Sequence, residues 1–186
     1  MKGVIQMNNI VNYQSGINFN GRVDRKSVKL AKKLGGDVLE NLEQKAKGLS
    51  KNTVLTVTDG ADRNVLTGIY AYNTKLGTKV HVDWTNNANL ASAVEKIDPA
   101  KVEEKIVDES IKHIKQEANT YPLRGFARKM LKADAKEVLN IEREFGINKP
   151  FWGDAKKLMT EAEERAARER VEYSKKHDWA VPNKAN

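Results

Sequence analysis

Six basic side chains near the N-terminus form the clearest chemical pattern in the sequence. They are Arg22, Arg25, Lys26, Lys29, Lys32 and Lys33. On a helical wheel of 100° per residue, they fall within one arc of about 120°. Asp24, a candidate N-cap, is the only acidic residue on that face. Because a cationic helix face attracts the phosphate backbone, the spacing predicts a binding site for nucleic acid or another polyanion.

Two other interpretations of this helix remain open. Lysine is the ordinary residue of solvated surfaces, so the face could be a solvent-exposed side with no ligand. An anionic membrane surface would attract the same charges, but the apolar side of the helix lacks the Trp or Phe that anchors such helices. A second basic group follows later in the chain and is expected to be a solvated helix face: Arg124, Arg128, Lys129, Lys132 and Lys136.

The distribution of charge along the chain supports the first interpretation. The 186 residues include 33 Lys and Arg against 25 Asp and Glu, a formal net charge of +8. Residues 1–60 alone hold ten basic and five acidic side chains. The excess is therefore concentrated around the basic helix, and a local field attracts ligands more effectively than a diffuse charge.

Catalytic chemistry has little support in the sequence. The chain has no cysteine, which excludes disulfides, thiolate metal sites and cysteine nucleophiles. Its three histidines show no metal-ligand spacing, and no phosphate-binding glycine loop is present. His81 and Asp83 alternate on a strand and could act as a base and its orienter in a small hydrolase or transferase. We nevertheless expect a non-enzymatic protein with no catalytic residue, no metal and no cofactor.

The elements that position these residues follow from local patterns. Asp24 predicts a helix to Leu34, and Asp37 predicts a second helix through Lys47. Three β-branched or alternating runs, 53–58, 65–73 and 78–84, lie at hairpin spacing and predict an antiparallel meander. Asp98-Pro99 predicts the start of a long helix, and the remaining periodicity predicts helices at 87–97, 123–145 and 154–176. The fold class is helix-rich α+β, a single domain with a three-stranded antiparallel β-meander packed against helices.

Aromatic residues on the meander allow a second type of contact. Tyr70 and Tyr72 share one face of the middle strand with Leu66 and Gly68. Exposed tyrosines on a sheet can stack on bases, although such rings more often pack at the edge of a core. The alternation of the third strand predicts that Val80, Val82 and Trp84 are buried and that Lys79, His81 and Asp83 are solvated.

The C-terminal part of the sequence offers an alternative function. A turn at 149–153 is expected to carry Phe151 and Trp152 onto the core. The helix that follows has a thin apolar stripe and many charged pairs, which is typical of a weakly packed helix. Protein–protein interaction or a structural role is the alternative to polyanion binding, through a protein partner or a homo-oligomer. Its candidate contact residues are Leu158, Met159 and Tyr173.

The predicted organisation has three parts: a flexible N-terminal arm (1–21), an α+β core domain (22–153), and a charged C-terminal helix and tail (154–186). An alternative division has one unit around the meander, 24–97, and a helical hairpin from residue 98. No apolar run is long enough to span a membrane, and the N-terminus has no apolar signal segment. These features predict a cytoplasmic location.

Overall fold

The computed structural model describes residues 20–58, 66–120, 125–149 and 151–176, without the side chains of 120, 125, 126, 151–156, 158 and 159. These residues form two compact units. The first comprises the described residues up to Ser110 together with Glu137–Asn148. The second comprises those of Ile111–Lys136 and from Lys149 onward. The predicted arm lies almost entirely outside the described residues, as does the predicted tail after Lys176.

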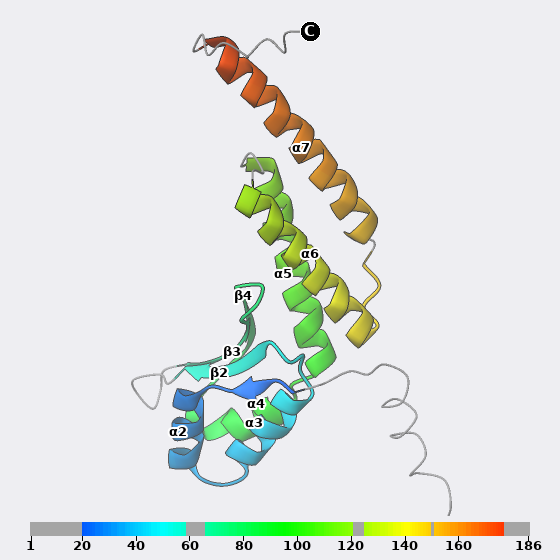
Figure 1. Ribbon diagram of the computed structural model, residues 1–186. Helices are drawn as coiled ribbons and strands as arrows, with labels where there is room; N and C mark the ends of the chain where they lie inside the picture. The colour runs from blue at the N-terminus through cyan, green and yellow to red at the C-terminus, as the bar shows by residue number, and fades with distance from the viewer. Residues whose placement is uncertain (1–19, 59–65, 121–124, 150, 177–186) are drawn as a thin grey trace, which may run out of the picture. The chain divides into compact units, whose positions relative to one another are not determined.

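The first unit contains a four-stranded mixed sheet (Figure 1). Its strands are β1 (Arg22–Val23), β2 (Thr53–Thr58), β3 (Thr67–Asn73) and β4 (Thr78–Thr85), in that spatial order. The broad α+β class is confirmed, and β2, β3 and β4 pair antiparallel as predicted. The prediction of a three-stranded, wholly antiparallel sheet is wrong, because β1 adds a fourth strand parallel to β2.

Helices α2 (Arg25–Leu34), α3 (Val38–Lys47) and α4 (Leu90–Glu95) lie on one side of this sheet (Figure 1). The short 3₁₀ helix η1 (Asn87–Asn89) leads into α4. The long helix α5 (Pro99–Thr120) contributes its first part, up to Ser110, to the same unit. Apolar side chains of the sheet and these helices form the core, and they have no exposed surface at Leu42, Leu55, Ile69, Leu90 and Ile106.

The bulge in β4 changes which side chains face the core. Tyr70 pairs with His81 but Ile69 pairs with Asp83, so Val82 is an extra residue. Because one inserted residue reverses the faces that follow it, Trp84 lies opposite Gly68 and is 51% exposed. The prediction that Trp84 is buried is therefore wrong.

The second unit consists of helical segments. It contains the rest of α5, the first part of α6 (Gly125–Phe145) and α7 (Phe151–Lys176). Small buried residues, Ala118, Ala162 and Ala166, allow the helices to approach closely. The Arg128 side chain pairs with Glu163 at 2.6 Å, and the Arg165 guanidinium donates a hydrogen bond to the carbonyl of Ala118.

Helix α7 begins earlier than the sequence predicts. Phe151, Trp152 and Gly153 are helical, so the expected turn at 149–153 with a helix starting at Asp154 is wrong at these positions. Gly153 lies in the first turn, where N–H groups have no intrahelical partner and a helix breaker costs little. The helix continues to Lys176, the last described residue.

Candidate functional site

Asp24 fixes the start of the basic helix α2. Its Oδ1 accepts hydrogen bonds from the backbone N–H groups of Lys26, at 2.7 Å, and Ser27, at 3.2 Å. This is the N-cap that the sequence predicts. Burial acts to raise the pKa of Asp24, but hydrogen bonds from the Ser27 side chain and these N–H groups outweigh it and lower the pKa. The carboxylate is therefore charged at neutral pH and is committed to the cap.

Ser27 determines which side of α2 faces the sheet. Strand β1 ends at Val23, so among the described residues no strand pairs with this edge of β2 beyond Leu55. The backbone N–H of Val57 instead donates to the Ser27 hydroxyl at 2.6 Å, and Ser27 is completely buried. Leu30 and Ala31 are buried on the same side. Because this side is held inward, the opposite side of the helix must face solvent.

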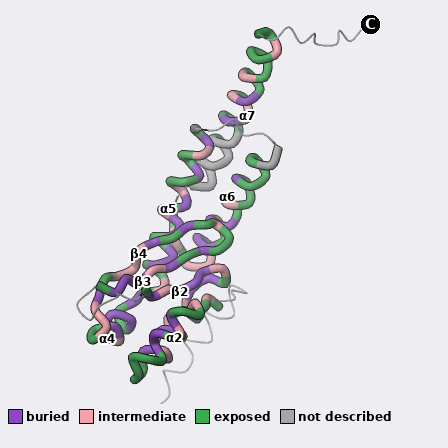
Figure 2. Tube along the Cα trace, turned by 90° about the vertical axis from the view of Figure 1, so that its left-hand side faces the viewer, coloured by how far each residue is buried: buried purple, intermediate pink, exposed green. Residues whose placement is uncertain are grey.

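Five of the six predicted cations lie on that solvent-facing side. Figure 2 shows exposed residues in green and buried residues in purple along α2. Every one of them is exposed, and within the described part of the chain none forms an ion pair. They are Arg25, Lys26, Lys29, Lys32 and Lys33. Because none of these cations has an ion-pair partner among the described residues, mobile ions compensate much of their charge, and a polyanion can displace such ions. We call these five residues the cationic face of α2.

Arg22 does not belong to that helical face. It lies in β1 opposite Val54, so its place on the helical wheel is wrong. The physical reason is that Asp24 caps a helix beginning at Arg25, which leaves Arg22 and Val23 extended. Its side chain is exposed on the sheet.

The basic group on α6 differs from α2. Arg128 pairs with Glu163, whereas Lys129, Lys132 and Lys136 are exposed. Arg124 lies outside the described residues. These lysines provide a charge-matched comparison for the cationic face of α2.

His81 and Asp83 do not form the pair that a hydrolase would need. Because of the bulge, His81 is paired with Tyr70 and Asp83 with Ile69, on opposite faces of the sheet. Asp83 lines a pocket of about 180 Å³ beside β4 that His81 does not reach. The predicted side-by-side arrangement is therefore wrong.

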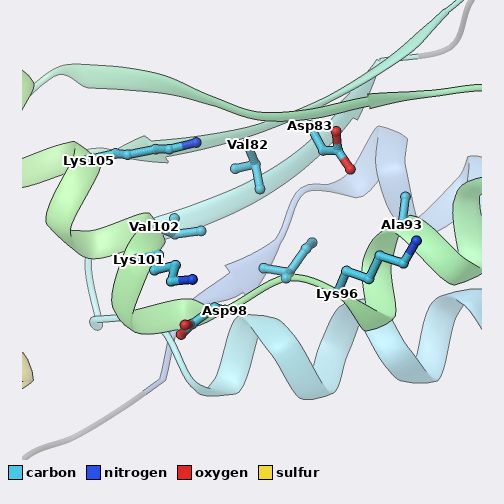
Figure 3. Close-up of a pocket in the computed structure, with 9 residues that line it drawn as sticks. Val82, Asp83, Ala93, Lys96, Asp98, Lys101, Val102 and Lys105 are labelled. Atoms are coloured by element: carbon cyan, nitrogen blue, oxygen red, sulfur yellow. The ribbon is translucent and has the colours of Figure 1, made fainter.

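That pocket is basic, but its amines do not converge (Figure 3). Three lysines line it together with two carboxylates and apolar side chains: Lys96, Lys101, Lys105, Asp83 and Asp98 are its charged residues. The Lys105 amine donates to the carbonyl of His81 at 3.3 Å, whereas the Lys96 amine lies on the other side of the pocket, near Ala93 (Figure 3). A phosphate at one position would not contact both amines.

An aromatic cluster lies on the side of the sheet opposite α2, α3 and α4, and the sequence does not predict it as a unit. The Tyr70 ring lies edge-on to His81 at 5.4 Å and to Trp84 at 5.8 Å between centroids. The His81 and Trp84 rings are 4.6 Å apart, and the Lys79 amine lies 4.0 Å above the Tyr70 ring. The alternation of the middle strand does predict that Tyr70 and Tyr72 share one face. The participation of Trp84 depends on the bulge, for which the sequence has no local signal.

Buried carboxylates form another feature that the sequence does not reveal. Glu103 is completely buried, and its Oε1 accepts from the Ser50 N–H at 2.9 Å. Glu137 accepts from the Asn52 amide at 2.6 Å and the Lys75 amine at 2.5 Å. Burial, followed by the charges of Glu103 and Glu137, raises the pKa of Glu144 to about 7. We call Glu103, Glu137 and Glu144 the glutamate cluster.

The C-terminal contact residues stay a prediction. Tyr173 is 62% exposed on α7. The side chains of Leu158 and Met159 lie outside the described residues.

Over the described residues, no group of three His, Cys, Asp or Glu side chains has the arrangement of a metal site. The helices described there also lack the combined length and apolarity needed to cross a membrane. Compared with models of protein families, with curated protein sequences and with solved structures, the chain matches none.

Proposed function

We propose that this protein binds polyanions, in particular nucleic acid, through the cationic face of α2. The observation that carries the proposal is the exposure of five cations on a ten-residue helix without an ion-pair partner in the described structure. Ser27, Leu30 and Ala31 anchor the opposite side, so binding requires little rearrangement of the helix. A cytoplasmic location, where nucleic acid is accessible, belongs to the same proposal.

Nucleic acid is favoured over a membrane surface for a packing reason. A membrane-binding helix inserts its apolar side among the acyl chains. In α2 that side is buried within the first unit, with Ala31 only 2% exposed. Apart from Leu34 at its end, which is 36% exposed, the helix therefore offers mainly its charges, which suits a phosphate backbone that is bound by counterion release.

The test compares two charge-reversed variants of the full chain by fluorescence anisotropy with a labelled DNA duplex. The first variant carries K26E, K29E and K33E on α2. The control carries K129E, K132E and K136E on α6, which changes the net charge by the same amount. We expect the α2 variant to bind at least about tenfold more weakly than wild type, because three phosphate contacts are lost. The control should bind within about twofold of wild type.

Two results would overturn the proposal. One is the absence of binding by wild type even at low salt. The other is an equal loss of affinity in both variants, because the total charge alone would then account for binding. Circular dichroism spectra that superimpose on the wild-type spectrum would establish that each variant is folded.

A further inference from the structure

We propose that the outer sheet face of the first unit binds the bases of single-stranded nucleic acid, with Trp84 and Tyr72 as stacking platforms. This inference rests on the proposed function and names the class of nucleic acid. The outer sheet face is the side of the sheet opposite α2, α3 and α4. Its members are Arg22, Val54, Thr56, Gly68, Tyr70, Tyr72, Lys79, His81 and Trp84.

The strand register places cations and aromatic rings in rows on this face. Arg22 pairs with Val54, Val54 with Tyr72, and Tyr72 with Lys79, so one row crosses all four strands. Paired residues on neighbouring strands project to the same face. Tyr72 is 38% exposed and lies between two exposed cations, Arg22 and Lys79.

Trp84 stands at the other end of the face. It pairs with Gly68, four residues before Tyr72 along β3, which corresponds to a separation of about 13 Å. The half-buried Tyr70 and His81 lie between these two positions. The exposed rings are thus spaced along the strand direction, as a platform for successive bases requires.

Gly68 allows the rings to cover the strand. A Cβ atom at this position would lie 2.5 Å from the Tyr70 ring and 3.0 Å from both the Trp84 ring and the Thr58 hydroxyl. Tyr70 and His81 contact Trp84 and leave 51% of the residue exposed. An aromatic ring held in place but open to solvent can stack on a base with little loss of conformational entropy.

The charge of the outer sheet face favours single-stranded nucleic acid as its partner. Arg22 and Lys79 supply cations for phosphates, and the acidic residue that follows β1, Asp24, is committed to the α2 cap. A single strand exposes its bases for stacking, whereas a duplex keeps them stacked on one another. We therefore expect the outer sheet face to discriminate between single strands and duplexes, and the cationic face of α2 to bind both.

The test measures the affinity of the full chain for a short oligothymidylate and for a duplex of equal length. We expect W84A to bind the single strand ~5- to 150-fold more weakly and Y72A to show a smaller loss in the same direction. Both variants should bind the duplex as wild type does. W84F, which keeps a ring, should recover part of the single-strand affinity.

A spectroscopic measurement separates stacking from a change in folding. The chain has three tryptophans, so W152F/W179F leaves Trp84 as the only one. In this variant, the single strand should quench the Trp84 fluorescence and the duplex should not. The Y72A variant provides an independent readout, because Tyr72 lies at the other end of the face.

The outcomes distinguish the two proposals. If wild type binds neither nucleic acid, the proposed function fails and this inference fails with it. If the α2 charge reversal weakens binding of both nucleic acids but W84A and Y72A bind the single strand as wild type does, only the stacking inference is overturned. Equal losses for duplex and single strand in W84A would also overturn it. So would unchanged Trp84 fluorescence on single-strand binding, in which case a protein would be the next partner to test for this face.

Discussion

The cationic face of α2 and the glutamate cluster lie in the same unit but expose their charges in opposite ways. The α2 cations are exposed and, within the described structure, lack ion-pair partners. The carboxylates of Glu103 and Glu137 are buried and receive hydrogen bonds from Ser50, Asn52 and Lys75. The first unit therefore exposes these cations to solvent, whereas it buries two of its carboxylates.

This difference shows that location decides what a charge does. An exposed cation contributes little to folding and much to the attraction of a ligand. A buried carboxylate attracts little from solvent. Its desolvation must be offset by local hydrogen bonds and opposite charge, so the loss of one of these partners destabilises the fold. We therefore expect substitutions in the glutamate cluster to change stability and substitutions on α2 to change binding.

The largest effect on stability should come from removing the counter-charge of Glu137. Lys75→Met leaves a buried carboxylate without its 2.5 Å amine partner, which should lower the free energy of unfolding by about 1 to 3 kcal/mol. Lys29→Met removes the same charge from α2 and should change it by less than about 0.5 kcal/mol. Urea denaturation of both variants measures the two values. Equal losses would break the comparison, because the α2 lysine would then also stabilise the fold.

A smaller effect should appear in the pH dependence of stability. The pKa of Glu144 is raised from its ordinary value of 4.5 to about 7. Between these two pH values, the folded protein therefore holds a proton on Glu144 that the unfolded chain releases. The stability contributed by neutral Glu144 is full below the ordinary value and is lost as the pH rises through about 7. Glu144→Gln removes this titration.

Urea denaturation at about pH 5 and about pH 8 measures the effect of Glu144→Gln. Wild type should lose about 1 kcal/mol more than the variant over this interval, after allowance for the partial exposure of the group. Asp24 has a lowered pKa, so its contribution is lost only at more acidic pH, whereas Glu103, whose pKa burial raises, is present in wild type and variant alike. Parallel pH profiles of wild type and variant would show that Glu144 is charged in the folded protein throughout this range.

The features that the sequence predicts well are those that depend on neighbouring residues. Asp24 caps α2 because its side chain reaches N–H groups two and three residues ahead. The strands of the meander follow from alternation and from short connections. The inward side of α2 follows from the helical period, which also places its cations outward.

The features that the sequence patterns do not predict depend on contacts between residues far apart in the chain. Strand β1 exists because Arg22 and Val23 pair with β2, which begins thirty residues later, and two residues carry no periodicity of their own. The bulge at Val82 reverses the face of Trp84 without any glycine or turn residue to mark it. The buried Glu103 accepts a hydrogen bond from the Ser50 N–H, a contact that no pattern within α5 could indicate.

The salt dependence of duplex binding tests the central claim most directly. For wild type, the logarithm of affinity should fall with the logarithm of salt concentration with a slope of about −3 to −5. The K26E/K29E/K33E variant should have a slope flatter by roughly 2 to 3, because each phosphate contact contributes about 0.9. The K129E/K132E/K136E variant should keep the wild-type slope. If both variants flatten the slope equally, or if the wild-type slope is near zero, the cationic face of α2 is not the polyanion-binding surface.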